Sequence, residues 1–330
     1  MGGPGRQNDP MAIYLIPLLG LLCLLPDLPF LHWHAWPAWV GLLAGVAVAL
    51  ALGNPHGQRT RPLVPKLLAW SVMGLGAAMN LKTVAVVGLQ GFGYTMVGIA
   101  VALALGTWLG RSLRVPRNTA ILVSVGTAIC GGSAIAAAAP VLRAEEEEAS
   151  VALATVFLLN AAALLIFPLI GHALHLSERA FGLWAALAIH DTSSVVGAAS
   201  GYGADALVVA TTTKLARALW IVPVTLALGL WVARREHREA GHAKAKRPWF
   251  ILGFLAAAAL VTYFPPLKPA GAIAAKLAVR ALVLTLFLLG LGLTRASLAK
   301  VGAKPFLQGI LLWLLVGSGT LGAILTGWIQ

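Results

Sequence analysis

The stretch Gly126-Thr-Ala-Ile-Cys-Gly-Gly-Ser-Ala-Ile-Ala-Ala-Ala-Ala-Pro140 decides the fold. It holds three glycines, a proline and two hydroxyl side chains, a composition that predicts a turn in a soluble protein. In a bilayer, irregular backbone is tolerated only where protein or a water-filled cavity satisfies its polar groups. Because apolar sequence flanks the stretch on both sides, we predict a discontinuous helix that lines a site near the middle of a membrane.

A second stretch, His190-Asp-Thr-Ser-Ser-Val-Val-Gly-Ala-Ala-Ser-Gly201, has the same small-residue texture and adds two ionisable side chains. We predict a second discontinuous helix here. The alternative for both stretches is close helix packing through small residues, which needs no binding site.

The composition places the whole chain in lipid. Apolar residues make up 59% of the chain and charged residues 11%, whereas an ordinary soluble domain has roughly 25% charged residues. The charges cluster between apolar runs, as expected of membrane spans and their loops. The longest polar connection, Arg234 to Pro248, is too short for a soluble domain. We therefore predict an all-α polytopic membrane protein in which residues 1–330 form a single membrane domain.

The sequence predicts about eleven transmembrane segments. They are Ala12–Leu25, Trp36–Leu52, Val64–Met79, Val84–Leu109, Asn118–Val141, Ser150–His172, Phe181–Tyr202, Ala206–Ala233, Trp249–Phe264, Gly271–Leu293 and Pro305–Trp328.

Lysines and arginines divide unevenly when the loops are numbered alternately from the N-terminus. Seventeen fall on the N-terminal side, and only Lys82, Arg143 and Lys268 fall on the other. The positive-inside rule then predicts a bacterial inner-membrane protein with its N-terminus cytoplasmic and its C-terminus periplasmic. If segments 118–141 and 181–202 both re-enter, Arg143 and Arg179 exchange sides and the totals stay the same. The rule therefore leaves open whether these two segments span.

Two similar stretches indicate an internal repeat. Gly74-Leu-Gly-Ala-Ala-Met-Asn-Leu-Lys82 and Gly290-Leu-Gly-Leu-Thr-Arg-Ala-Ser-Leu298 each precede a long span. The predicted topology puts them on opposite sides, as an inverted repeat requires. We predict inverted repeats of roughly residues 12–145 and 150–330.

Five ionisable side chains lie inside the apolar segments: Asp191, Lys214, Arg217, Lys276 and Arg280. Each is costly in lipid and must face a cavity, find a partner or, as Lys276 can, snorkel to the interface. Four cations against one acid favour a pathway for anions. A helix N-terminus near the midplane would add free N–H groups.

The side chains around these charges leave two questions open. Ser133, Thr192, Ser193 and Ser194 are neutral donors suited to an oxyanion. His190 titrates near neutral pH and could couple transport to protons, but it could equally be structural. Asp191 could take part in coupling or form a structural ion pair with Arg217 or Arg280.

Several classes of function are excluded. The basic residues are scattered without interleaved aromatics, so we expect no nucleic-acid partner. Cys23 and Cys130 fit small buried hydrophobes and predict neither a disulfide nor a metal site. The chain has no catalytic motif, ATP-binding loop or cofactor signature, so we expect a gradient-driven protein that is not an enzyme. The run Glu145–Glu148 fits the first turn of a helix.

Four stretches resemble the sulfate exporter family, also called the YeiH family. They are Ala128-Ile-Cys-Gly-Gly-Ser-Ala-Ile-Ala136, His190-Asp-Thr-Ser-Ser-Val-Val-Gly-Ala198, Thr213-Lys-Leu-Ala-Arg-Ala-Leu-Trp-Ile-Val-Pro223 and Pro248-Trp-Phe-Ile-Leu-Gly-Phe254. The resemblance covers the chain from about Leu63 to its end. The Ala216-Arg217-Ala218 run departs from it, because a more polar residue is expected after the arginine.

The resemblance implies membership of the bile-acid/arginine/sodium–proton carrier superfamily, with inverted repeats and two crossing discontinuous helices. It also implies export of sulfate, sulfite or a related sulfur oxyanion. The site residues that it implies are Cys130, Gly131, Gly132, Ser133, His190, Asp191, Thr192, Ser193, Lys214 and Arg217.

We therefore predict a secondary transporter of a small oxyanion, with sulfate or sulfite favoured, that works by alternating access. A proton- or sodium-coupled organic-anion carrier and a passive anion channel are the alternatives. The predicted substrate-binding residues are Gly131, Gly132, Ser133, Thr192, Ser193, Ser194, Lys214, Arg217 and Arg280, with His190 and Asp191 for coupling. The expected partners are the anion and the lipid bilayer; a coupling proton or sodium ion and a homodimer stay open.

Overall fold

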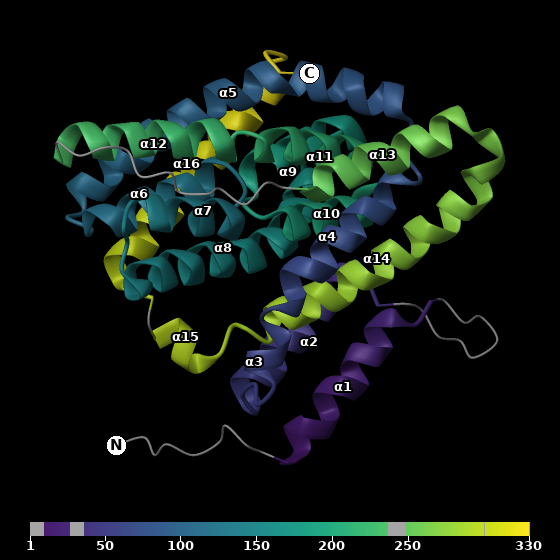
Figure 1. The fold of residues 1–330 in the computed structure, drawn as a ribbon, viewed down its shortest axis with the longest axis horizontal. Coiled ribbons are helices and arrows are strands. Elements are labelled where there is room, and N and C mark those ends of the chain that lie inside the picture. The colour runs from purple at the N-terminus through teal and green to yellow at the C-terminus, as the bar shows by residue number, and fades with distance from the viewer. Residues whose placement is uncertain (1–9, 27–35, 237–248, 300, 330) are drawn as a thin grey trace. The chain divides into compact units, whose positions relative to one another are not determined.

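The computed structural model describes residues 10–26, 36–236, 249–299 and 301–329, and its regular elements there are all helices (Figure 1). The all-α prediction is confirmed for these residues. The chain divides into two compact units, residues 1–83 with 249–299 and residues 84–248 with 300–330. The predicted repeat boundaries do not coincide with this division and stay a prediction.

Unit 1 is built around one long helix. Its elements are α1 (Pro10–Leu24), α2 (Ala38–Ala51), α3 (Gly57–Thr60), α4 (Leu63–Gly76), α13 (Trp249–Tyr263), the short 3₁₀ helix η2 (Pro265–Leu267), α14 (Lys268–Gly290) and α15 (Arg295–Ala299). Helix α14 packs against α1, α2 and α4. Glycines allow this close approach: a Cβ on Gly41 would lie 2.9 Å from the Val283 carbonyl oxygen.

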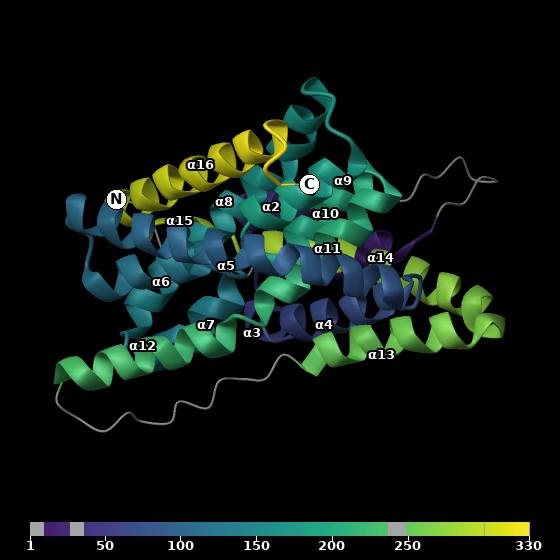
Figure 2. The same cartoon turned by 90° about the horizontal axis from the view of Figure 1, so that it is seen from above.

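Unit 2 contains both of the irregular stretches. Its helices are α5 (Leu81–Ser112, mostly within this unit), α6 (Arg117–Ala128), α7 (Gly132–Val141), α8 (Glu146–Ala173), α9 (Glu178–Ala188), α10 (Thr192–Tyr202), α11 (Ala204–Ala218), α12 (Ile221–Glu236) and α16 (Ala303–Leu325). Figure 1 shows α8 as one continuous helix alongside α7 and α10, and Figure 2 shows α12 beside α7.

Among the described residues, five helical stretches are long and apolar enough to cross a membrane. They are Gly91–Ser112, Glu146–Ala173, Ala204–Arg234, Pro265–Gly290 and Ala303–Leu325. A sixth candidate is the pair Gly57–Gly76 and Leu81–Leu89, bent by 112°. Four shorter apolar helices of 10–17 residues lie at Met11–Leu24, Ala38–Ala51, Gly132–Val141 and Trp249–Tyr263. The chain is thus a helical membrane protein, and the count of eleven spans stays a prediction.

The stretch 117–141 folds into a helical hairpin. Its two arms are α6 and α7, and the backbone N–H of Gly131 donates to the Gly126 carbonyl at the turn, 2.8 Å away. At the other end, the Asn118 amide donates to the Glu148 carboxylate, 3.0 Å away, in the first turn of α8. The start of α6 therefore lies beside the residues that follow α7. We call α6–α7 the first hairpin and residues 129–131 its tip.

The stretch 178–202 folds back in the same way. Tyr202, the last residue of α10, stacks on Phe181 near the start of α9 with ring centroids 3.7 Å apart. The Tyr202 hydroxyl also donates to the Leu176 carbonyl, 2.8 Å away. We call α9–α10 the second hairpin and residues 189–191 its tip. Both predicted helix breaks are confirmed, but the arms turn back at each break, so the expectation of crossing discontinuous helices was wrong.

Helix α8 connects the two hairpins and sets their direction. The base of the first hairpin lies at Glu148, near the start of α8, and the base of the second lies at its end, where His172 stacks on Tyr202 at 4.3 Å. A 28-residue helix is about 42 Å long at 1.5 Å per residue. The bases of the two hairpins therefore lie at opposite ends of α8, and both tips point toward its middle.

Candidate functional site

The two hairpin tips touch each other. Gly131 in the first tip has φ +65°, a backbone conformation that favours glycine. A Cβ on this residue would also lie 3.4 Å from both the Cα and the Cβ of Asp191 in the second tip. Glycine is needed here for its conformation, and the close contact brings the two predicted irregular stretches together.

Arg217 on α11 links the two tips. Its Nε donates to the Ala128 carbonyl at 2.7 Å and its second terminal nitrogen to the Thr127 carbonyl at 3.1 Å, both in the last turn of α6. The other terminal nitrogen donates to the carbonyls of Ala186, at 3.3 Å, and Leu187 in the last turn of α9. The last carbonyls of a helix lack partners within it and carry its negative dipole end. One guanidinium thus stabilises the C-terminal ends of both α6 and α9.

Lys214 reinforces the second tip from the same helix. Its Nζ donates to the Ile189 carbonyl at 2.6 Å and to the Ala186 carbonyl at 3.3 Å. Lys214 is 0% exposed and Arg217 is 1% exposed. Burial of two cations this deep requires compensation, and the helix carbonyls supply it. The cations therefore have a structural role that the sequence analysis did not foresee.

Asp191 caps the outgoing arm of the second hairpin. Its Oδ2 accepts from the Ser193 N–H at 3.0 Å and from the Ser193 hydroxyl, so the carboxylate lies at the positive end of α10. No ion pair joins Asp191 to Arg217 or Lys214 in the described part of the chain, because both cations donate to carbonyls. The alternative of a structural Asp191–Arg217 ion pair is thus not supported.

Asn160, near the middle of α8, is a site residue that the sequence analysis missed. Its Oδ1 accepts from the backbone N–H groups of His190 at 3.2 Å and Asp191 at 3.1 Å. The signal was present in the sequence, because an amide inside an apolar span is as unexpected as a charge. Asn160 holds the second tip at the level where the hairpins meet.

Several buried polar atoms of the hairpins, of Asn160 and of α11 have no hydrogen-bond partner among the described residues. They are Asn160 Nδ2, both ring nitrogens of His190, and the hydroxyls of Thr127, Ser194, Thr211, Thr212 and Thr213. Buried polar groups are nearly always hydrogen-bonded, so such a concentration needs a physical cause. Contact with solvent or with a polar ligand would supply one.

The remaining predicted residues occupy different places. Gly132 and Ser133 begin α7, and Ser133 is exposed. Thr192, Ser193 and Ser194 form the buried first turn of α10. Arg280 belongs to unit 1, where it donates to the Trp36 carbonyl at 2.9 Å. The structure brings together the residues predicted in unit 2, and the role of Arg280 stays a prediction.

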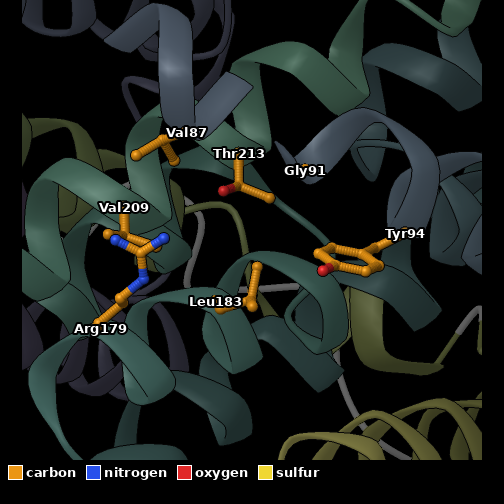
Figure 3. A pocket seen from close by; sticks show the side chains of 7 residues that line it. All are labelled: Val87, Gly91, Tyr94, Arg179, Leu183, Val209 and Thr213. Atoms are coloured by element: carbon orange, nitrogen blue, oxygen red, sulfur yellow. The ribbon is translucent and has the colours of Figure 1, made fainter. Parts of the chain in front are cut away.

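A small hollow on unit 2 leads toward the buried threonines. It is lined by Val87, Gly91 and Tyr94 of α5, Arg179 and Leu183 of α9, and Val209 and Thr213 of α11 (Figure 3). Arg179 is exposed, whereas Thr213 is 0% exposed and precedes Lys214 in the chain. The hollow therefore extends from the exposed Arg179 side chain to Thr213, which directly precedes the buried Lys214 in the chain.

The charges at the tips do not balance. Counted at their formal charges, Lys214 and Arg217 contribute two positive charges and Asp191 contributes one negative charge. The partial charges of the two helix N-termini and the two helix C-termini at the tips cancel. The N-terminus of α7 begins at Gly131 without any side-chain cap, whereas Asp191 caps α10. An anion at the uncapped N-terminus would reduce this imbalance.

The chain is similar to proteins described only as membrane proteins. The family model described as Conserved hypothetical protein 698 matches residues 11–309. A UPF0324 membrane protein of Bdellovibrio bacteriovorus is 60% identical over 88% of this chain and 89% of its own length. UPF0324 membrane proteins of Geobacter sulfurreducens and Porphyromonas gingivalis are 47% and 49% identical, each over 87% of this chain and over 90% and 86% of their own lengths. No solved structure matches the chain.

Proposed function

We propose that this chain, which belongs to the family described as Conserved hypothetical protein 698, is a secondary transporter of a small inorganic oxyanion. Sulfate or sulfite is the favoured substrate, and export by alternating access across the bacterial inner membrane is the favoured mode. The observation that carries the proposal is the meeting of two hairpin tips around an excess of positive charge and unpartnered polar groups.

The free groups at the tips suit an anion better than a cation. Carbonyls of Thr127, Ala128, Ala186, Leu187 and Ile189 already accept from Arg217 or Lys214. The Asn160 Oδ1 and the Asp191 Oδ2 are occupied as well. The groups without partners are an amide N–H₂, an imidazole and hydroxyls, which can all donate to an oxyanion.

The same inventory favours protons over sodium as the coupling ion. A sodium ion needs several oxygen ligands, and most carbonyl and carboxylate oxygens at the tips are already used. His190 is 1% exposed and has two unpartnered ring nitrogens. A proton on His190 would add the positive charge that a dianion such as sulfate needs for balance. We therefore assign the coupling role to His190.

Lys214 and Arg217 act on the anion through their charge. Because their donors are held by helix carbonyls, they attract the anion from a distance and leave the direct contacts to neutral donors. The uncapped N-terminus of α7, with Gly132 and Ser133, is the proposed contact point on the first hairpin. Thr192 and Ser194 in the first turn of α10 are the proposed contacts on the second.

The hairpins also suggest how the chain crosses the membrane. If α8 spans once, the first hairpin re-enters from the side of its N-terminus and the second from the opposite side. Arg143 and Arg179 then exchange sides, and the loop asymmetry of seventeen to three is unchanged. The first hairpin would enter from the cytoplasm and the second from the periplasm. Two hairpins of opposite direction are what an inverted repeat predicts.

Counterflow in proteoliposomes tests the proposal. Vesicles loaded with unlabelled sulfate or sulfite should accumulate the labelled anion, with saturation and with stimulation by the anion inside. An inward proton gradient should change the rate, and replacing sodium by choline should not. Large conductance without counterflow would favour a channel, and counterflow of carboxylates alone would favour an organic-anion carrier. Protein-free vesicles are the control.

A further inference from the structure

Asn160 is oriented by the second hairpin. Only the oxygen of its side-chain amide can accept hydrogen bonds, and it accepts from two consecutive backbone N–H groups, those of His190 and Asp191. This fixes the amide so that Nδ2 is presented on the other side. Nδ2 is fully buried and has no partner among the described residues.

The backbone contacts alone do not explain why this residue is an asparagine. An aspartate could accept from the same two N–H groups, although its carboxylate would lose more hydration on burial than the amide does. What the amide adds is a neutral N–H₂ donor, and leaving such a donor buried and unpaired is destabilising. A functional use of the donor accounts for both the choice of amide and its orientation.

The surroundings of Asn160 indicate what the donor contacts. It lies near the middle of α8, where the two hairpin tips meet. Residues of the preceding helical turn pack on the first tip: a Cβ on Gly131 would lie 3.3 Å from the Val156 side chain, and one on Gly132 would lie 3.1 Å from Phe157. Asn160 therefore hydrogen-bonds the second tip and lies one helical turn beyond the residues that contact the first hairpin.

We infer that Asn160 binds the transported oxyanion directly, with Nδ2 donating to an anion oxygen while Oδ1 holds the second tip. This inference rests on the proposed function and names a specificity-determining residue within that site. A neutral donor selects ligands that carry lone pairs on oxygen and gives nothing to a metal cation. A site built to donate also discriminates strongly against ligands that cannot accept.

Asn160→Asp separates the two roles of the side chain. The carboxylate keeps an acceptor for His190 and Asp191 and nearly the same volume, but it loses the donor and repels the anion. We expect the melting temperature of the purified protein to stay within a few degrees of wild type. We expect the half-saturating sulfate or sulfite concentration in counterflow to rise at least ~30-fold at neutral pH. Protonation would restore a donor, so the defect should shrink as the pH falls.

Asn160→Ala is the matched variant that removes both roles, and it should lower both the melting temperature and the affinity. If Asn160→Asp folded and transported like wild type at neutral pH, the donor role would be overturned and only tip positioning would remain. Should Asn160→Asp fail to fold, Asn160→Ser decides, because its hydroxyl can still donate and should bind better than Asn160→Ala. Equal affinities for these two variants would contradict the inference.

Transport by the wild-type protein in the same vesicles distinguishes a failure of the proposed function from a failure of the role assigned to Asn160. If wild type shows no counterflow with any oxyanion, the proposed function fails. If wild type transports and Asn160→Asp does so equally well, the function stands and only the role of Asn160 is lost.

Discussion

The two hairpins meet at their tips, but they are held there in different ways. The second tip is held by Asn160 and Lys214, which hydrogen-bond its backbone, and by Asp191, a tip residue whose carboxylate caps α10 at Ser193. The first tip has no such cap; among the described residues, Arg217 supplies its side-chain hydrogen bonds, and Gly131 supplies its close contact.

A tip with an uncapped helix N-terminus can offer N–H groups to a ligand, whereas a tip capped by its own carboxylate cannot do so as readily. In the proposed transporter, this difference makes the second hairpin the fixed side of the site and the first hairpin the side that would receive the anion.

Arg217→Met should have the largest effect, because Arg217 is, among the described residues, the side chain that bonds the helix ends leading into both tips. Four carbonyls in two helix ends lose a donor at once, and breaking a buried charged contact costs about 3–5 kcal/mol. We expect counterflow to fall at least ~100-fold and the melting temperature to fall by several degrees. Arg111→Met, at an exposed position on α5, is the control and should match wild type. A stable, fully active Arg217→Met protein would show that the tips do not depend on this link.

Gly131→Ala should break the first tip alone. The residue has φ +65° and ψ −125°, a conformation that costs an L side chain about 1–3 kcal/mol, and its Cβ would lie 3.3 Å from the Val156 side chain and in van der Waals contact with Asp191. Transport should drop ~10-fold or more, while the second hairpin keeps its hydrogen bonds. Gly201→Ala, where a Cβ meets nothing within 4 Å, is the matched control and should be neutral or slightly stabilising. Equal behaviour of the two variants in a melting assay and in counterflow would argue against contact between the tips.

Asp191→Asn and Asp191→Ala separate the capping hydrogen bonds of Asp191 from its negative charge. Asparagine is also a good N-cap, so Asp191→Asn should keep the stability of α10, while alanine should cost about 0.5–2 kcal/mol. Removing the negative charge should raise anion affinity several-fold in Asp191→Asn, as measured by the half-saturating concentration in counterflow. Weaker anion binding by Asp191→Asn would mean that the carboxylate is part of the transport mechanism rather than a cap.

Thr213→Cys should have the smallest effect on transport, and it reports whether a reagent in solution can reach the buried end of the hollow. Thr213 is buried, yet it lines the hollow that begins at Arg179 (Figure 3). We expect near-normal counterflow and modification by a small, charged thiol reagent that is slowed by sulfate or sulfite. The variant should be made in a background without Cys23 and Cys130. No modification under turnover conditions would show that the hollow does not lead to the site.

The sequence was enough to locate the breaks but not their geometry. Glycines, a proline and hydroxyls in an apolar chain predicted irregular backbone at Gly131 and near Asp191, and both positions are tips. Whether a broken helix continues or turns back depends on contacts distant in the sequence, such as Tyr202 with Leu176 and Asn118 with Glu148. The local sequence contains no signal for these pairings.

The structure locates the predicted buried cations, and their role in anion binding stays a prediction. Lys214 and Arg217 were identified because cations in apolar segments are costly, and both lie at the tips. Their partners are backbone carbonyls, which no sequence pattern marks, so their structural role could not be read beforehand. Asn160 was missed because only ionisable groups were sought inside the spans. A search for every polar side chain in an apolar segment would have found it.

Amide hydrogen exchange of the wild-type protein, followed by mass spectrometry with and without sulfate or sulfite, tests the central claim most directly. The claim is that the two tips together form the anion site. It predicts that the anion slows exchange in peptides covering residues 129–135 and 189–195, with the larger change in the first because that tip lacks a cap. Counterflow of the anion with unchanged exchange at both tips, or with protection confined to unit 1, would contradict the account.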